Sequence, residues 1–145
     1  MPKKTVEIQM RWSDMDLNAH VNNVLFLRYL EEARIRFMTD VWQAQTGDVA
    51  VLVAHQEIDY VRPLVYALEP ARFDIWISDI GTSRYTFGYE VFDPAGNLCA
   101  RAESTLVSID PRTQRATPIP DDVRTELEAH LGEPVALHRR TSGRG

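Results

Sequence analysis

Residues 23–46 contain neither glycine nor proline, and this segment constrains the fold more than any other feature of the chain. Apolar residues recur in it three or four positions apart or at multiples of that spacing, namely at Val24, Leu27, Leu30, Phe37 and Val41. This spacing is typical of one face of a helix. Gly47 follows, at a position suited to a left-handed helix cap. The segment therefore predicts one long helix that ends before Gly47.

The predicted helix is apolar over more than one stripe. Phe26, Tyr29 and Trp42 widen the apolar surface, while charged pairs such as Arg28 and Glu32 are four residues apart on another face. We therefore expect this helix to be wrapped by a sheet or covered by a partner subunit.

The rest of the chain predicts strands. In residues 6–12 the apolar residues Val6, Ile8, Met10 and Trp12 alternate with polar ones, which is typical of a strand with one buried face. Turn-forming residues at 81–83 and 93–97 separate further predicted strands, which cover residues 49–62, 71–80, 84–92 and 98–109. The last three strands form a meander, and a short helix runs from Asp121 to about residue 131. One long helix on one sheet predicts an α+β fold.

Composition limits the function classes. The 145 residues are 44% apolar, enough for one domain, and the net charge of −5 disfavours nucleic acid as a partner. Cys99 is the single cysteine, so neither an internal disulfide nor a cysteine zinc site is expected.

The two ends of the chain give further expectations. The first residues lack the apolar stretch of a signal peptide, and no run approaches the roughly 18 apolar residues of a membrane span. We therefore expect a soluble, cytoplasmic protein without a membrane partner. A single domain over residues 1–131 is predicted, followed by a mobile polar tail over 132–145 that contains Arg139, Arg140 and Arg144.

Polar residues are densest just before the long helix. Residues 14–23 contain two carboxylates, one imidazole and three amides, namely Asp14, Asp16, His20, Asn18, Asn22 and Asn23. The first turn of a helix offers unpaired N–H groups that polarise a carbonyl and stabilise an oxyanion. A carboxylate beside it can act as a nucleophile or as a general base. From these residues alone, an ordinary loop carboxylate and an N-cap at Asn22 are the favoured explanation of the pattern.

Residues 16–34, with the sequence DLNAHVNNVLFLRYLEEAR, resemble the signature of the hotdog-fold acyl thioesterases, specifically the 4-hydroxybenzoyl-CoA thioesterase-like group. They are also similar to the D-x-N-x-H-V-N-N-V motif of plant acyl-carrier-protein thioesterases. The resemblance implies a curved antiparallel sheet wrapped around the central helix, in a homodimer or homotetramer with active sites at the dimer interface. It implies hydrolysis of an acyl-CoA or acyl-carrier-protein thioester without a cofactor.

The resemblance also assigns roles. Asp16 matches the catalytic carboxylate, and Asn23 matches the residue whose backbone amide contacts the thioester carbonyl. Asn18 and His20 match residues thought to orient water or the carboxylate. Asp14 is expected to be structural, because two adjacent ionised carboxylates repel each other. A metal site from Asp14, Asp16 and His20 is not expected, since nothing else in the chain completes it.

Two alternatives stay open. Hotdog enoyl-thioester hydratases resemble D-x-N-P-x-H, with five positions from Asp to His, whereas Asp16 and His20 are four apart and the proline is missing. A non-catalytic acyl-thioester sensor is the other alternative. A further expectation concerns residues on the second predicted strand that could line the acyl or pantetheine channel, namely His55, Gln56, Glu57, Tyr60 and Arg62.

Overall fold

The structure, a computed structural model, describes residues 3–44 and 49–138 of the chain. The elements run in the order β1 (Lys4–Ile8), a 3-10 turn (Trp12–Asp14), α1 (Asn23–Ala44), β2 (Ala50–Tyr60), β3 (Ala71–Ile80), β4 (Arg84–Phe92), β5 (Leu98–Asp110), β6 (Arg115–Ala116) and α2 (Asp121–Glu128).

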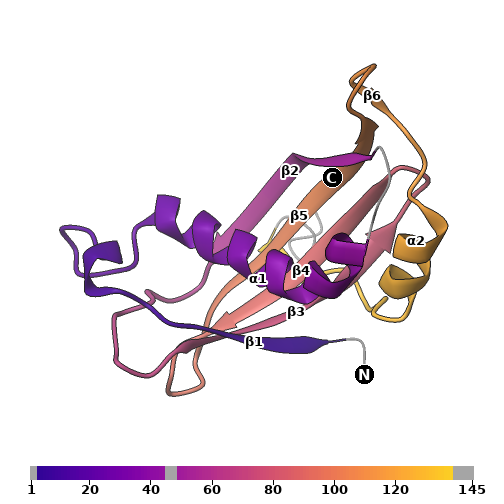
Figure 1. The fold of residues 1–145 in the computed structure, drawn as a ribbon. Helices are drawn as coiled ribbons and strands as arrows, with labels where there is room; N and C mark the ends of the chain where they lie inside the picture. Colours follow the sequence, from indigo (N-terminus) through magenta and orange to yellow (C-terminus); the bar gives the residue numbers. More distant parts are fainter. Residues whose placement is uncertain (1–2, 45–48, 139–145) are drawn as a thin grey trace.

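The strands form one antiparallel sheet in the order β1-β3-β4-β5-β2, with the short β6 paired to β5. Helix α1 lies across one face of this sheet (Figure 1). Leu30, Ala33 and Met38 on α1 are fully buried, and so are Phe87 and Tyr89 on β4. The expected α+β hotdog fold is confirmed.

The sequence predicts most element boundaries to within two residues. Helix α1 begins at Asn23 as predicted, while residues 45–46 and Gly47 lie outside the described residues. The predicted first strand was too long, because the chain leaves the sheet after Ile8 and turns at Trp12–Asp14. Met10 is nevertheless buried, whereas Trp12 is 76% exposed. Strand β6 was not predicted, and it pairs with the end of β5 through two residues only.

One side of α1 and the edge strand β2 leave apolar side chains uncovered. Val24, Leu27 and Ile35 on α1 are 67%, 36% and 49% exposed, and Leu52 and Val53 on β2 are 51% and 47% exposed. The sheet therefore wraps only part of the apolar circumference that the sequence predicts for this helix.

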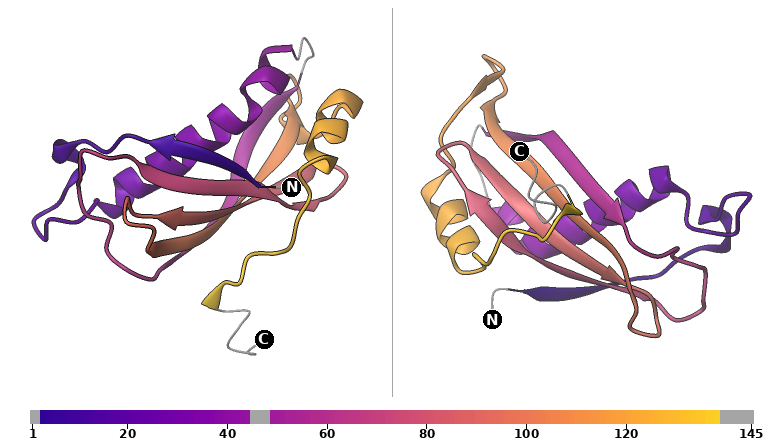
Figure 2. Two further views of the ribbon diagram at one scale, coloured as in Figure 1. Left: turned by 90° about the horizontal axis from the view of Figure 1, so that it is seen from below. Right: turned by 180° about the vertical axis from the view of Figure 1, so that it is seen from behind.

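The prediction of a free tail from Gly132 is wrong for residues 132–137. This segment runs over the face of the sheet opposite α1 (Figure 2). The Gly132 N–H donates to the Ile77 carbonyl at 2.7 Å, and Val135 and Leu137 are buried. Alternating apolar residues give the segment a face that packs on the sheet, where Gly88 leaves the space that Val135 fills. Arg139, Arg140 and Arg144 lie outside the described residues.

Candidate active site

The polar segment before α1 is a closed loop. The Asn22 N–H donates to the Asp14 carbonyl at 2.9 Å, and Met15 pairs with Val21 in an antiparallel bridge. Inside the loop, the Asp16 N–H donates to the His20 carbonyl at 2.8 Å. The tight turn needs a left-handed residue, and Ala19 takes this conformation with φ of 61°. These bonds hold residues 14–22 in one conformation directly before the helix.

Backbone amides of this loop orient the Asp16 carboxylate. The Asn18 N–H donates to Asp16 Oδ1 at 2.9 Å, and the His20 N–H approaches the same oxygen at 3.4 Å. The first contact is a normal hydrogen bond, and the second is weak. Asp16 is partly exposed, so its second oxygen is available to a ligand or to water.

The start of α1 presents an unpaired donor beside this loop. Asn22 is the N-cap, since its Oδ1 accepts from the Val24 N–H at 2.9 Å and its carbonyl accepts from the Phe26 N–H at 2.9 Å. Among the residues that the structure describes, the Asn23 amide N–H has no hydrogen-bond acceptor. Such amides form the positive end of the helix dipole and bind anionic oxygens.

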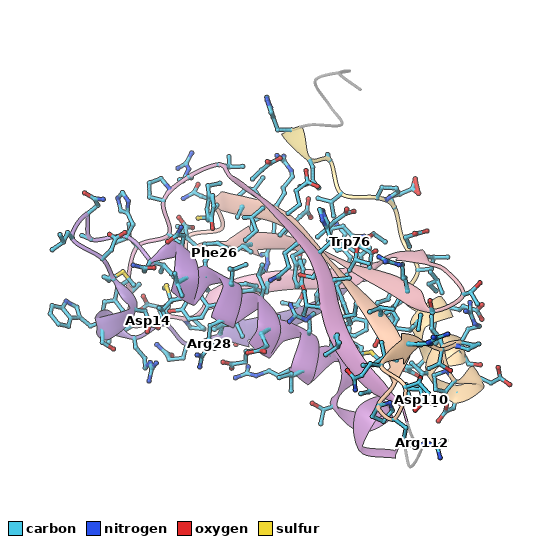
Figure 3. All side chains as sticks on the ribbon, turned by 90° about the horizontal axis from the view of Figure 1, so that it is seen from above. Asp14, Phe26, Arg28, Trp76, Asp110 and Arg112 are labelled. Carbon is cyan, nitrogen blue, oxygen red and sulfur yellow. The ribbon has the colours of Figure 1, made fainter. Side chains whose placement is uncertain are left out.

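Asp16 and Asn23 share a cleft of about 400 Å³. Ten residues line it, from the loop, the start of α1 and the segment after β2: Asp16, His20, Val21, Asn23, Phe26, Tyr60, Val61, Arg62, Pro63 and Leu64. Figure 3 shows Phe26 near the N-terminal end of α1, with Asp14 close to the same end of the helix. The cleft therefore combines a carboxylate, a helix N-terminus and an apolar wall.

The wall opposite the helix is fixed by backbone bonds. The Val61 and Arg62 N–H groups both donate to the Cys99 carbonyl, at 2.8 and 3.1 Å. The Phe26 and Tyr60 rings pack edge to face with centroids 5.3 Å apart. Burial raises the pKa of Tyr60, so its hydroxyl stays neutral at physiological pH. The side of the cleft away from Asp16 is therefore aromatic and uncharged apart from Arg62.

The structure brings together three of the four predicted site residues. Asp16, His20 and Asn23 line the cleft, whereas Asn18 does not and contributes its backbone N–H. From the second set of predicted residues, Tyr60 and Arg62 line this cleft, whereas His55, Gln56 and Glu57 do not. Five further residues line the cleft that were not predicted as site residues, namely Val21, Phe26, Val61, Pro63 and Leu64. Val21 and Phe26 lie within the motif at residues 16–34, whereas Val61, Pro63 and Leu64 lie at or directly after the end of the predicted strand 49–62.

Asp14 does not line this cleft. Its side chain is buried, accepts a hydrogen bond from the Tyr29 hydroxyl and lies 3.5 Å from the Arg11 guanidinium. These contacts support the structural role expected for Asp14. In the part of the chain that the structure describes, no group of three or more His, Cys, Asp and Glu side chains is arranged to hold a metal ion.

Comparison with known proteins gives consistent matches over most of the chain. A family model described as the thioesterase-like superfamily matches residues 10–127. The long-chain acyl-CoA thioesterase FadM of Escherichia coli (strain K12) is 31% identical over 126 residues, which cover 84% of this chain and 95% of that protein.

Solved structures agree in fold. A predicted thioesterase from Bacillus stearothermophilus superimposes with a TM-score of 0.81 at 28% identity, covering 91% of this chain and 98% of that one. A thioesterase from Thermus thermophilus, solved in complex with coenzyme A and Zn, gives a TM-score of 0.76 at 29% identity, covering 92% and 97%. Within the described residues, no helix is long and apolar enough to span a membrane.

Proposed function

Because this chain belongs to the thioesterase-like superfamily, we propose that it is an enzyme that hydrolyses acyl-CoA thioesters to the free acid and coenzyme A. One observation carries the proposal: the Asp16 carboxylate and the unpaired Asn23 amide line the same cleft. A carbonyl bound between these two groups meets a hydrogen-bond donor on its oxygen and a base or nucleophile near its carbon.

The Asn23 amide polarises the thioester carbonyl. Its N–H donates to the carbonyl oxygen, and the N-terminal end of the α1 dipole stabilises the negative charge that develops there. One such donor contributes roughly 10²–10³ in rate. The Asn23 side chain is not required for this role, because the backbone provides the hydrogen.

Asp16 supplies the second part of the chemistry by one of two routes. As a general base it takes a proton from water, the hydroxide adds to the carbonyl carbon, and the C–S bond breaks. As a nucleophile its oxygen adds to that carbon and expels the thiolate, and water then hydrolyses the mixed anhydride. In both routes the departing thiolate takes up a proton. A single turnover in heavy-oxygen water distinguishes the routes, since water can leave its label on Asp16 only if an anhydride forms.

His20 and Asn18 support Asp16 in different ways. The His20 side chain lines the cleft and can orient the attacking water. The Asn18 N–H holds one Asp16 oxygen at 2.9 Å, which leaves the other oxygen for the substrate. The role of Asn18 therefore lies in its backbone rather than in its amide side chain.

The apolar wall accommodates the acyl group. Phe26, Tyr60 and Leu64 offer an apolar surface next to the reacting groups, and Arg62 offers a cation at the same cleft. The net charge of −5 favours coenzyme A over an acidic carrier protein as the thiol carrier.

The uncovered apolar side chains on α1 and β2 support a homodimer or homotetramer. Leu52 and Val53 lie on an edge strand, where unpaired backbone groups and apolar side chains invite pairing with a second chain. Tyr60 ends this strand and lines the cleft, so a partner chain on β2 adjoins the active site.

Thiol release tests the proposal. A chromogenic disulfide follows hydrolysis of aliphatic and aromatic acyl-CoAs by the wild type, by Asp16→Asn and by Asp121→Asn, an exposed carboxylate on α2. We expect Asp16→Asn to lose at least roughly a hundredfold in turnover and Asp121→Asn to keep the wild-type rate. Full activity of Asp16→Asn removes this residue from the mechanism. If the wild type binds an acyl-CoA without hydrolysing it, the result favours a sensor. If an enoyl-CoA loses its enoyl absorbance when the wild type is added, the result favours a hydratase.

A further inference from the structure

A buried hydrogen bond links the second turn of α1 to the base of the Asp16 loop. The Tyr29 hydroxyl donates to Asp14 Oδ2, and both side chains are almost completely buried, with 4% and 3% exposure. The Tyr29 ring packs edge to face against Phe73 on β3, with centroids 6.3 Å apart. Asp14 is therefore tied through Tyr29 to the centre of the core.

Asp14 also closes the loop that follows it. Its carbonyl accepts from the Asn22 N–H at 2.9 Å, and its Oδ2 accepts from the Arg11 N–H at 3.3 Å. Asn22 in turn caps α1 directly before the Asn23 amide. Asp14 thus contacts Arg11 before the loop, Asn22 at the end of the loop and Tyr29 on α1.

We propose that Tyr29 and Asp14 are positioning residues, which hold the Asp16 carboxylate in place relative to the Asn23 amide without contacting the substrate. This inference rests on the proposed function for its kinetic consequence. Its structural content, that the Tyr29–Asp14 bond orders residues 14–22, is independent of which reaction the cleft performs.

The strain in the loop explains why such an anchor is needed. Ala19 has φ of 61°, and a left-handed conformation of a non-glycine residue persists only where the surrounding structure enforces it. Asp16 lies between this strained residue and the Asp14 anchor. If the anchor is released, the loop can relax, and the Asp16 carboxylate loses its fixed position.

The protonation state of Tyr29 suits this role. Burial first, and then the Asp14 carboxylate, raises the pKa of Tyr29. The hydroxyl therefore remains a hydrogen-bond donor throughout the physiological range and is not an acid or base for the reaction.

Tyr29→Phe tests the inference, with Tyr89→Phe as the matched control. Tyr89 is also fully buried, and its hydroxyl accepts a hydrogen bond from Arg34 at 3.1 Å, away from the Asp16 loop. The first readout is amide hydrogen exchange, which requires no substrate. In Tyr29→Phe we expect amide exchange at Asp16 and Asn22 to accelerate roughly tenfold or more, because both N–H groups donate within the loop. In Tyr89→Phe we expect the exchange rates of these two amides to equal those of the wild type.

The second readout is kinetic. Tyr29→Phe is expected to lower kcat roughly tenfold to a hundredfold with KM within about twofold of wild type, because misplaced groups lose rate rather than affinity. Tyr89→Phe is expected to keep kcat within about twofold. Two substitutions of Asp14 test the same hydrogen bond. Asp14→Asn retains an acceptor for the Tyr29 hydroxyl and should be more active than Asp14→Ala.

The outcomes separate the two proposals. Unchanged loop exchange in Tyr29→Phe, or equal effects of Tyr29→Phe and Tyr89→Phe, overturns the positioning role even where the wild type is active. If the wild type hydrolyses nothing, the proposed function fails, and the exchange readout still decides the inference. If Asp14→Ala does not fold, Tyr29→Phe decides alone.

Discussion

The Val21 N–H donates to the Leu64 carbonyl at 2.8 Å, and this bond joins the two walls of the cleft. Val21 belongs to the loop that carries Asp16, whereas Leu64 belongs to the segment after β2. The Cys99 carbonyl holds the same segment from β5. The cleft therefore depends on hydrogen bonds between segments far apart in the chain. Substitutions in these segments test its geometry.

Asn23→Pro should abolish most of the activity, whereas Asn23→Ala should keep it. Proline is well tolerated at the first position of a helix but has no N–H, so it removes the proposed oxyanion donor with little effect on α1. We expect Asn23→Pro to lower kcat by roughly 10²–10³. Thiol release and thermal unfolding of both variants check this prediction, and equal rates contradict a role for the amide.

Ala19→Gly should preserve or raise stability, whereas Ala19→Val should lower it. Ala19 has φ of 61°, a region that glycine adopts without strain and a β-branched residue strongly disfavours. The gain on Ala19→Gly is expected to be at most about 1 kcal/mol, because the unfolded chain also gains freedom. Urea unfolding of the wild type and the two variants gives their order of stability. An Ala19→Val variant as stable as the wild type argues against strain at this position.

Gly88→Ala should displace the C-terminal segment from the sheet. A Cβ at Gly88 meets the Trp76 ring and Val135 Cγ2 at 2.8 Å each, which is closer than real contacts allow. We expect a loss of about 1–3 kcal/mol in the free energy of unfolding, as for other overpacked sites. Gly81→Ala is the control, since its nearest atom is the Arg84 carbonyl oxygen at 3.4 Å. Equal stability of both variants contradicts tight packing of residues 132–137.

Ile35→Glu should weaken assembly without unfolding the chain. Ile35 is 49% exposed on α1, so a charge there is tolerated in one chain but is costly within an apolar interface. Light scattering at micromolar concentration should show a smaller mass for Ile35→Glu than for wild type. Leu68→Glu, at a loop residue that is 76% exposed, is expected to leave the mass unchanged. A wild type that is already monomeric contradicts the proposed oligomer.

Stability should fall above pH 10. Burial raises the pKa of Tyr89, and burial with Asp14 raises the pKa of Tyr29, so the unfolded chain loses these protons first as pH rises. Above the ordinary tyrosine pKa of about 10, the native state binds more protons than the unfolded state, and the free energy of unfolding decreases with pH. Unfolding at pH 8, 10 and 11 checks the trend, which should be shallower in Tyr29→Phe.

Helix α1, the meander and the candidate carboxylate could all be predicted from the amino-acid sequence. The period of apolar residues in 23–46 and in 71–80 is local information, and Asn22 caps the helix through atoms two residues away. The motif from Asp16 to Asn23 is also continuous in the chain. These features depend on neighbours in sequence, so the residues alone predict them.

Most of the residues that meet this motif from other parts of the chain could not be predicted and are known from the folded structure. Phe26 on α1 packs against Tyr60 because β2 ends beside the start of α1, and Tyr29 donates to Asp14 because both side chains are buried where the loop meets α1. The packing of Val135 and Leu137 likewise depends on the space above Gly88. Such contacts join segments far apart in the chain, and their formation depends on how the whole sheet packs rather than on any local pattern of residues.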